Sequence, residues 1–168
     1  MSVPSRPRTA DRASPRSPLA SSTAFLLSKA GRTSAARIAA RLEPLGLRPK
    51  HLAVLSFLDD APGSSQQELG GRLGFDASAV VALIDELERQ RLAERRQDPR
   101  DRRRHAVHLT RRGRTMLAQA RAAAAEHEET LLGVLDHEER QTLHDLLLRI
   151  VAAEDPTLAP VVTDPGRR

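Results

Sequence analysis

Hydrophobic positions along this chain recur mostly at helical spacing. The first set lies on one helical face at steps of seven, four, four and three residues, and comprises Leu27, the polar Ser34, Ile38, Leu42 and Leu45. This spacing predicts a helix over residues 22–43, which ends where Pro44 disfavours the α conformation of the residue before it. A second helix is predicted from Pro49, because proline suits a first helical position, to about Asp59.

Two further helices are predicted after the breaker Ala61-Pro62-Gly63. Ser65 can cap the first of them, with Glu68 completing a capping box. Asp76 can cap the second, over residues 77–90. The predicted inward positions of this second helix are Val80, Leu83, Ile84 and Leu87. Two helices joined by a short turn that contains glycine are the helix-turn-helix signature.

A pair of short strands is predicted directly after this signature. Residues 92–96 can run as one strand, and residues 106–109 alternate like a second. Asp98-Pro99 begins the turn between them, because proline presets φ for a reversal and aspartate bonds its own backbone there. A two-stranded ribbon with guanidinium groups at its tip is a wing.

Two more helices are predicted beyond the wing. Thr110 can cap one over residues 111–135, and Asp136, with Glu139 at the capping-box position, can cap the last. The apolar stripe of the last helix is Leu143, Leu146, Leu147, Ile150 and Val151. A helix-turn-helix lobe could not cover this stripe and that of the first helix, and such uncovered faces mark partner surfaces. We favour a homodimer over an intrachain three-helix bundle.

Charge is concentrated in the wing region. Residues 89–114 hold eleven arginines and three acidic residues, which gives this stretch a charge of +8, whereas the whole chain carries +5. Everything outside the stretch therefore sums to −3. Such segregation is the electrostatic footprint of a nucleic-acid binder, although a solvated basic loop is the alternative.

Composition narrows the possibilities further. The chain has 168 residues with no cysteine, which excludes disulfides and thiolate metal sites within it. No apolar run approaches the length of a membrane span, and we expect a cytoplasmic, nucleoid-associated bacterial protein without membrane contact. Residues 1–21 and 155–168 are expected to be tails, the first of them basic and disordered. The N-terminal tail loosely resembles a mitochondrial transit peptide, but its prolines disfavour the amphipathic helix that such a peptide needs.

Two rival classes of function find little support. An enzyme or metal site would have to use histidines, but His105 and His108 point to opposite faces of a strand, and no HExxH pattern occurs near His137 and His144. We therefore expect no enzyme, metal or cofactor. Single-strand and RNA binders use aromatic stacking platforms, and the chain has only three aromatic residues. Duplex DNA is the expected partner.

The residues of the helix-turn-helix and wing carry a family resemblance. LGLRPKHLAVLSFL, the region PGSSQQELGGRLGFDASAVVALIDELERQRL and above all DPRDRR followed by HAVHLTRRG resemble the multiple-antibiotic-resistance regulator (MarR) family. The resemblance implies a mainly α fold with a small β wing: a winged helix-turn-helix lobe over about 48–112, and N- and C-terminal dimerisation helices over about 22–46 and 111–154. The domain would span residues 22–154.

The resemblance also implies a function. Members bind pseudo-palindromic operators as homodimers, usually as repressors, and many respond to a small anionic or aromatic effector. Helix 77–90 would enter the major groove, and Asp101 would orient Arg103 towards the minor groove. The residues expected to contact DNA are Ser65, Gln66, Gln67, Asp76, Ala77, Ser78, Ala79, Ala82, Arg95, Arg96, Arg100, Arg102 and Arg103, with Asp98 and Asp101 orienting the wing. A non-sequence-specific architectural DNA-binding protein is the alternative.

The chain departs from the family pattern at three positions. Val81 and Ala82 stand where members often have threonine and a basic residue, so fewer bidentate base contacts are available. Specificity would then lean on contact of Ala77 or Ala79 with thymine methyl groups and on shape readout. Arg91 replaces a frequent glycine after this helix. The effector site stays open: Arg32, Arg37 and His51 could pair with an anion or serve only as surface or interhelix residues.

Overall fold

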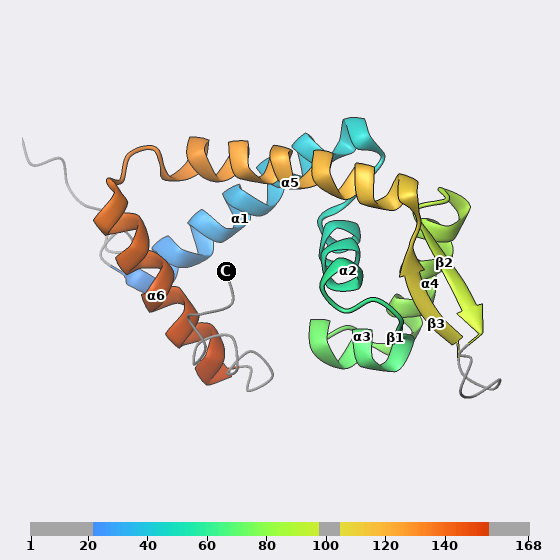
Figure 1. Ribbon diagram of the computed structural model, residues 1–168. Coiled ribbons are helices and arrows are strands. Elements are labelled where there is room, and N and C mark those ends of the chain that lie inside the picture. The colour runs from blue at the N-terminus through green and yellow to red at the C-terminus, as the bar shows by residue number, and fades with distance from the viewer. Residues whose placement is uncertain (1–21, 98–104, 155–168) are drawn as a thin grey trace, which may run out of the picture. The chain divides into compact units, whose positions relative to one another are not determined.

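Helices make up most of the structure (Figure 1). The computed structural model describes residues 22–97 and 105–154. The elements in chain order are α1 (Thr23–Leu42), the 3-10 helix η2 (Glu43–Leu45), α2 (Pro49–Asp60), β1 (Ser64–Ser65), α3 (Gln66–Leu73), α4 (Ala77–Arg89), β2 (Ala93–Gln97), β3 (His105–Leu109), α5 (Arg111–Leu132) and α6 (His137–Glu154). The predicted fold class, mainly α with a small β wing, is confirmed.

The chain divides into two compact units, residues 1–34 and 35–168. The described part of the first unit is the beginning of α1, where Leu26 and Leu27 are 49% and 41% exposed. The second unit holds the end of α1 and every later element.

Capping residues set most helix ends where the sequence predicted them. The Ser65 hydroxyl accepts from the Glu68 N–H at 3.2 Å, and the Glu68 carboxylate accepts from the Ser65 N–H at 2.7 Å. These two bonds complete the predicted capping box. Gly74 then ends α3 with a φ of 65°, a left-handed conformation that glycine adopts without strain.

Three strands, not two, form the sheet. Their order is β1-β3-β2, and both pairings are antiparallel. Ser64 lies opposite Val107 and Ser65 opposite Ala106, so the residue that caps α3 also ends a strand. This pairing fixes the start of α3 to the wing. The sequence predicted only β2 and β3, because β1 is too short to show an alternating pattern.

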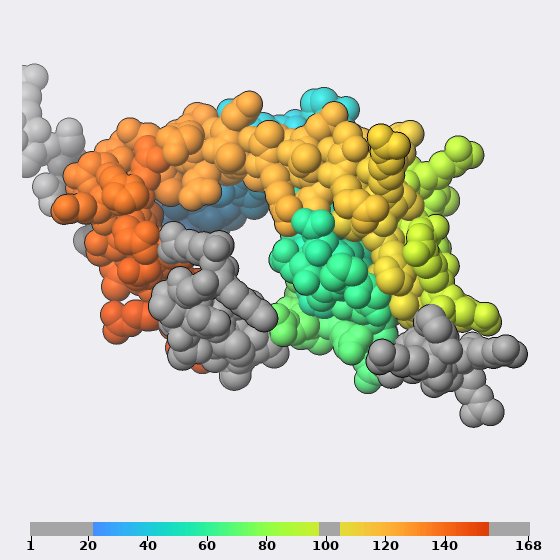
Figure 2. Space-filling model, viewed as in Figure 1, coloured from blue at the N-terminus to red at the C-terminus, as the bar shows by residue number. Residues whose placement is uncertain are grey.

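A single apolar core joins the helix-turn-helix to the wing and to α5. Its fully buried large side chains include Leu42, Leu55, Leu58, Leu69, Ile84, Leu87, Leu92, Val107 and Leu117. Figure 2 shows the atoms of α2 packed directly against the first half of α5. All four predicted inward positions of α4 are buried. The core therefore draws buried side chains from α2, α3, α4, β2, β3 and α5.

The last two helices differ from the sequence prediction mainly in their ends. Helix α5 ends at Leu132, before Gly133, rather than at residue 135. Asp136 accepts from the Glu139 N–H at 2.9 Å, and the Glu139 carboxylate accepts from the Asp136 N–H at 2.9 Å, so the predicted cap of α6 is present. No residue of α6 is fully buried. None of the helices over residues 22–97 and 105–154 is both long and apolar enough to cross a membrane.

Candidate nucleic-acid interface

Helix α4 begins at a carboxylate cap. Asp76 Oδ1 accepts from the Ala79 N–H at 2.8 Å and from the Ser78 hydroxyl at 2.5 Å. The Ser78 hydrogen bond, followed by that of Ala79, lowers the pKa of Asp76 below its ordinary value. Asp76 therefore stays ionised near neutral pH, and it fixes the first turn of α4.

The two faces of α4 are chemically distinct. Its inward face is apolar and buried, whereas Ala77, Ser78, Val81 and Ala82 are exposed. Ala79 is only half-buried. Among the predicted DNA-contacting residues of this helix, Ala77, Ser78 and Ala82 thus share one accessible surface with Val81. The sequence did not predict a DNA contact for Val81.

Helix α3 begins at Gln66, among the residues predicted to contact phosphates. The first N–H groups of any helix lack intrahelical acceptors and favour anions. The Ser65 N–H and hydroxyl are both bonded to Glu68, so Ser65 serves the cap first. Gln66 is half-buried and Gln67 is exposed. Of the three predicted phosphate contacts here, Gln67 is the most accessible.

A buried histidine fixes α4 to α2. His51 is 2% exposed, and its Nε2 lies 2.8 Å from Glu86 Oε2. Its Nδ1 accepts from the Arg48 N–H at 3.1 Å, which makes His51 part of the α2 cap. Arg48 also forms an ion pair with Glu86. One carboxylate on α4 therefore joins two residues at the start of α2.

Burial and charge set the protonation of this cluster. Burial lowers the pKa of His51, and the Glu86 hydrogen bond only partly opposes that effect. The hydrogen bonds from Arg48 and then His51 lower the pKa of Glu86. The pattern fits a neutral imidazole that donates from Nε2 and accepts at Nδ1. The ring therefore has no donor left for an anionic effector.

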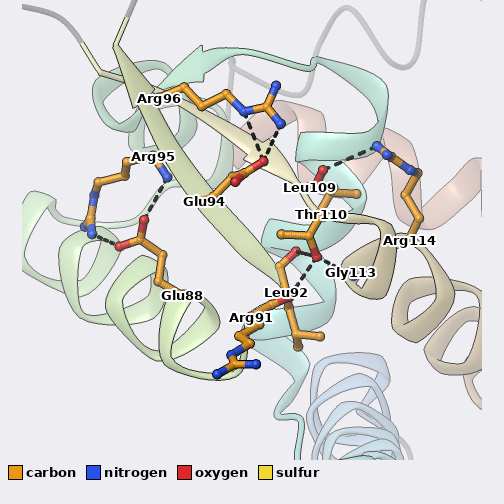
Figure 3. Close-up of polar contacts among 10 residues, drawn as sticks. All are labelled: Glu88, Arg91, Leu92, Glu94, Arg95, Arg96, Leu109, Thr110, Gly113 and Arg114. Carbon is orange, nitrogen blue, oxygen red and sulfur yellow. Dashed lines mark hydrogen bonds and ion pairs between the residues drawn. The ribbon is translucent and has the colours of Figure 1, made fainter.

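The two described wing arginines have different surroundings (Figure 3). Arg95 points towards α4, where it forms ion pairs with Glu88 and with Asp85, the latter at 2.7 Å. Its N–H also donates to Glu88 at 2.7 Å. Arg96 lies on the opposite face of β2, is exposed, and pairs with Glu94. Arg95 therefore holds β2 against α4, whereas Arg96 is the more available for DNA.

The wing tip lies outside the described residues. Asp98, Arg100, Asp101, Arg102 and Arg103 all fall within residues 98–104, which the structure does not describe. Their predicted DNA contacts and orienting roles stay predictions.

The base of the wing is closely packed against α5. Thr110 caps α5 by accepting from the Gly113 N–H at 2.9 Å, and its hydroxyl donates to the Arg91 carbonyl at 2.7 Å. Its N–H donates to the Leu92 carbonyl at 3.1 Å. A β-carbon at Gly113 would lie 1.9 Å from that same carbonyl oxygen. The sequence Leu-Thr-Arg-Arg-Gly thus builds the joint between wing and helix (Figure 3).

Arg91 occupies a conformation that favours glycine. Its φ is 59°. Its N–H donates to the Glu88 carbonyl at 2.8 Å, and the Leu92 N–H donates to the Leu87 carbonyl at 2.8 Å. These two bonds form the Schellman end of a helix, which usually has glycine at this position. Helix α4 therefore ends in a left-handed residue even though that residue is not glycine.

A pocket of about 560 Å³ lies beside the histidine cluster. Its lining includes Ala39, Glu43, Arg48, His51, Glu86 and Gln90. The other two candidate anion-binding residues, Arg32 and Arg37, are exposed on α1. Within the described ranges, no three His, Asp or Glu side chains are grouped to hold a metal ion.

Comparisons with known proteins agree with this geometry. The MarR family model matches residues 45–104, from the end of η2 into the wing. A candidate transcriptional regulatory protein for the hcr operon of Thauera aromatica is 32% identical over 116 residues, which are 69% of this chain and 70% of that protein. The resemblance carried by the helix-turn-helix and wing residues is thereby confirmed.

Solved structures give the same result. The transcriptional repressor CouR bound to a 23-mer DNA duplex is 33% identical, with a TM-score of 0.74 over 79% of this chain and 94% of that chain. CouR from Rhodococcus jostii RHA1 bound to p-coumaroyl-CoA is 30% identical, with a TM-score of 0.70 over 79% of this chain and 93% of that one. Both the winged-helix fold and the prediction of a transcriptional regulator rather than an enzyme are confirmed.

Proposed function

This chain belongs to the MarR family of DNA-binding transcriptional regulators, and we propose that it represses transcription by binding a pseudo-palindromic operator as a homodimer. The observation that carries the proposal is the outward face of α4. That face is exposed over Ala77, Ser78, Val81 and Ala82, while the opposite face is buried and both ends are fixed. An accessible, rigidly held second helix of a helix-turn-helix is suited to the major groove.

The wing supplies the electrostatic part of the proposal. Residues 89–114 carry +8, and cations that neutralise phosphates account for most of the non-specific affinity for DNA. Arg96 is exposed on β2. Arg103, oriented by Asp101, would enter the minor groove and respond to its width rather than to base identity. The two elements would thus read DNA in different ways.

Exposed apolar residues support the homodimer. Leu146, Ile150 and Val151 of α6 are 48%, 50% and 42% exposed. Apolar stripes of this kind are costly to leave in water and mark a partner surface. A second copy would cover them and give the assembly two-fold symmetry, which matches a pseudo-palindrome whose half-sites lie about 34 Å apart.

A small-molecule effector is part of the proposed function. The related CouR has been crystallised with p-coumaroyl-CoA, which is both aromatic and anionic. We therefore extend to this chain an effector of anionic or aromatic character that releases the operator. Screening such compounds against operator binding would test this part separately.

One observation favours the alternative of a non-sequence-specific architectural protein. From Ala77 to Asp85, α4 contains no arginine, lysine, asparagine or glutamine, and these are the side chains that make bidentate contacts to guanine and adenine. Sequence selection by the intact protein distinguishes the two functions. Repeated capture of duplexes from a random library should enrich one sequence with two inverted half-sites. A library that stays random after several rounds would support the architectural function instead.

A further inference from the structure

One exposed apolar side chain stands apart from the rest. The large hydrophobic residues exposed in the described part of the chain are Leu26, Leu27, Val81, Val134, Leu146, Ile150 and Val151. All except Val81 lie in α1, in α6 or in the turn between α5 and α6. Val81 is 44% exposed in the middle of α4. A dimer through α1 and α6 accounts for the exposed residues of those two helices, whereas Val81 lies on neither.

The surroundings of Val81 form a small apolar patch. Ala77 and Ser78 lie four and three residues earlier, on the same face of the helix, and Ala82 is adjacent; all three are exposed. The Ser78 hydroxyl donates its hydrogen to Asp76. Ser78 can therefore accept but not donate while this bond is kept. The patch thus offers methyl groups and acceptors.

This chemistry selects among the base edges of the major groove. Guanine presents only acceptors there, which require a donor such as arginine or lysine. Thymine presents an apolar 5-methyl group, and its adenine partner presents an amine donor. Cytosine, the partner of guanine, also presents an amine donor, so acceptor oxygens do not separate the two pairs. The 5-methyl group of thymine is the feature that an apolar side chain can select.

We propose that Val81 is a specificity-determining residue that packs against the 5-methyl group of a thymine in each operator half-site. The inference rests on the proposed function, because it requires α4 to lie in the major groove. Neighbouring cations support duplex DNA as the occupant of this surface. Arg89, two turns further along α4, is exposed, and Arg95 of β2 neutralises Asp85 on the next turn of α4.

The experiment removes the methyl group of the thymine, or the methyl groups of Val81, and measures the effect on binding. The operator is the sequence that selection with the intact protein enriches. Each thymidine of one half-site is then replaced in turn by deoxyuridine, which differs from thymidine only in lacking the 5-methyl group. Affinities of wild-type protein, Val81→Ala and the control Val134→Ala are measured by fluorescence anisotropy. Val134 is 90% exposed and outside the helix-turn-helix. Equal melting temperatures confirm that the variants fold.

We expect one thymine whose replacement weakens binding by wild type and Val134→Ala about fourfold, since burial of one methylene-sized group is worth about 0.8 kcal/mol. Val81→Ala should bind both duplexes equally. If no deoxyuridine affects wild type, or if Val81→Ala is as sensitive as wild type, the role of Val81 is disproved while the proposed function stands. A selection that enriches no sequence overturns both.

Discussion

At the scale of single residues, Gly113 is the glycine, among those that the structure describes, where an added β-carbon would meet the nearest neighbouring atom. We predict that Gly113→Ala lowers the free energy of unfolding by about 3 kcal/mol, because the new β-carbon would overlap the Leu92 carbonyl oxygen 1.9 Å away and force α5 from the wing. Urea denaturation would measure the loss. Gly71→Ala is the matched control, since a β-carbon there meets nothing within 4 Å. Equal stabilities of the two variants would contradict the close packing at this joint.

At Arg91, by contrast, a substitution should stabilise the protein. Because its φ of 59° is strained for a residue with a side chain, Arg91→Gly should raise the free energy of unfolding by about 0.5–1 kcal/mol after allowance for the flexibility of glycine in the unfolded chain. Arg91→Ala removes the same charge but keeps the strain, so it should bring no such gain. Thermal or urea unfolding of the two variants would separate the effect of the lost charge on stability from the effect of the backbone conformation.

Residue identity alone predicted the helix caps, but it did not predict the side-chain contacts between residues far apart in the sequence. Serine, aspartate and threonine at Ser65, Asp76 and Thr110 all cap helices as expected, because capping depends on near neighbours in sequence. The partners of His51 and Arg95 could not be read in this way. His51 meets Glu86 across 35 positions, and only the packing of α2 on α4 brings them together.

At the scale of elements, the stability that the contact between α2 and α4 contributes should depend on pH. Burial lowers the pKa of His51 from 6.5, so the unfolded chain binds a proton there more readily than the folded chain does. The stability that this histidine contributes is therefore present above about pH 6.5 and is lost as the pH falls below that value. Protonation at Nδ1 would also remove the acceptor for the Arg48 N–H.

Urea denaturation at pH 7.5 and 5.5 would test this expectation. Wild type should lose stability at the lower pH, and His51→Gln should lose less, because the glutamine side chain does not take up a proton in this range. His144→Gln, at an exposed position of α6, should behave like wild type. An identical pH dependence in all three proteins would show that His51 does not contribute.

Helical elements were more predictable than the sheet. Periodicity and caps located all five main helices of the second unit to within about three residues at each end, whereas β1 was missed altogether. A strand of two residues has no period to detect, and it forms because β3 presents an open edge to Ser64 and Ser65. The outward face of α4 was predicted, but the prominence of Val81 emerged only from its exposure.

At the scale of the whole molecule, the exposed apolar stripe of α6 predicts self-association. Light scattering at micromolar concentration should give twice the 18.4 kDa of one chain. The double substitution Leu146→Glu and Ile150→Glu should shift the mass towards one chain, because it places charges in the proposed interface. Val134→Glu changes a residue outside α6 and serves as the control. A monomeric mass for wild type would contradict the homodimer.

Sequence-specific binding of duplex DNA is the central expectation, and one titration tests it most directly. Fluorescence anisotropy at ~0.15 M salt would compare the duplex enriched by selection with a shuffled duplex of the same composition. We predict at least ~1000-fold tighter binding to the enriched sequence, the lower end of specific recognition by proteins of this kind. Equal affinities for the two duplexes would show that the face of α4 does not read sequence, and would contradict the account.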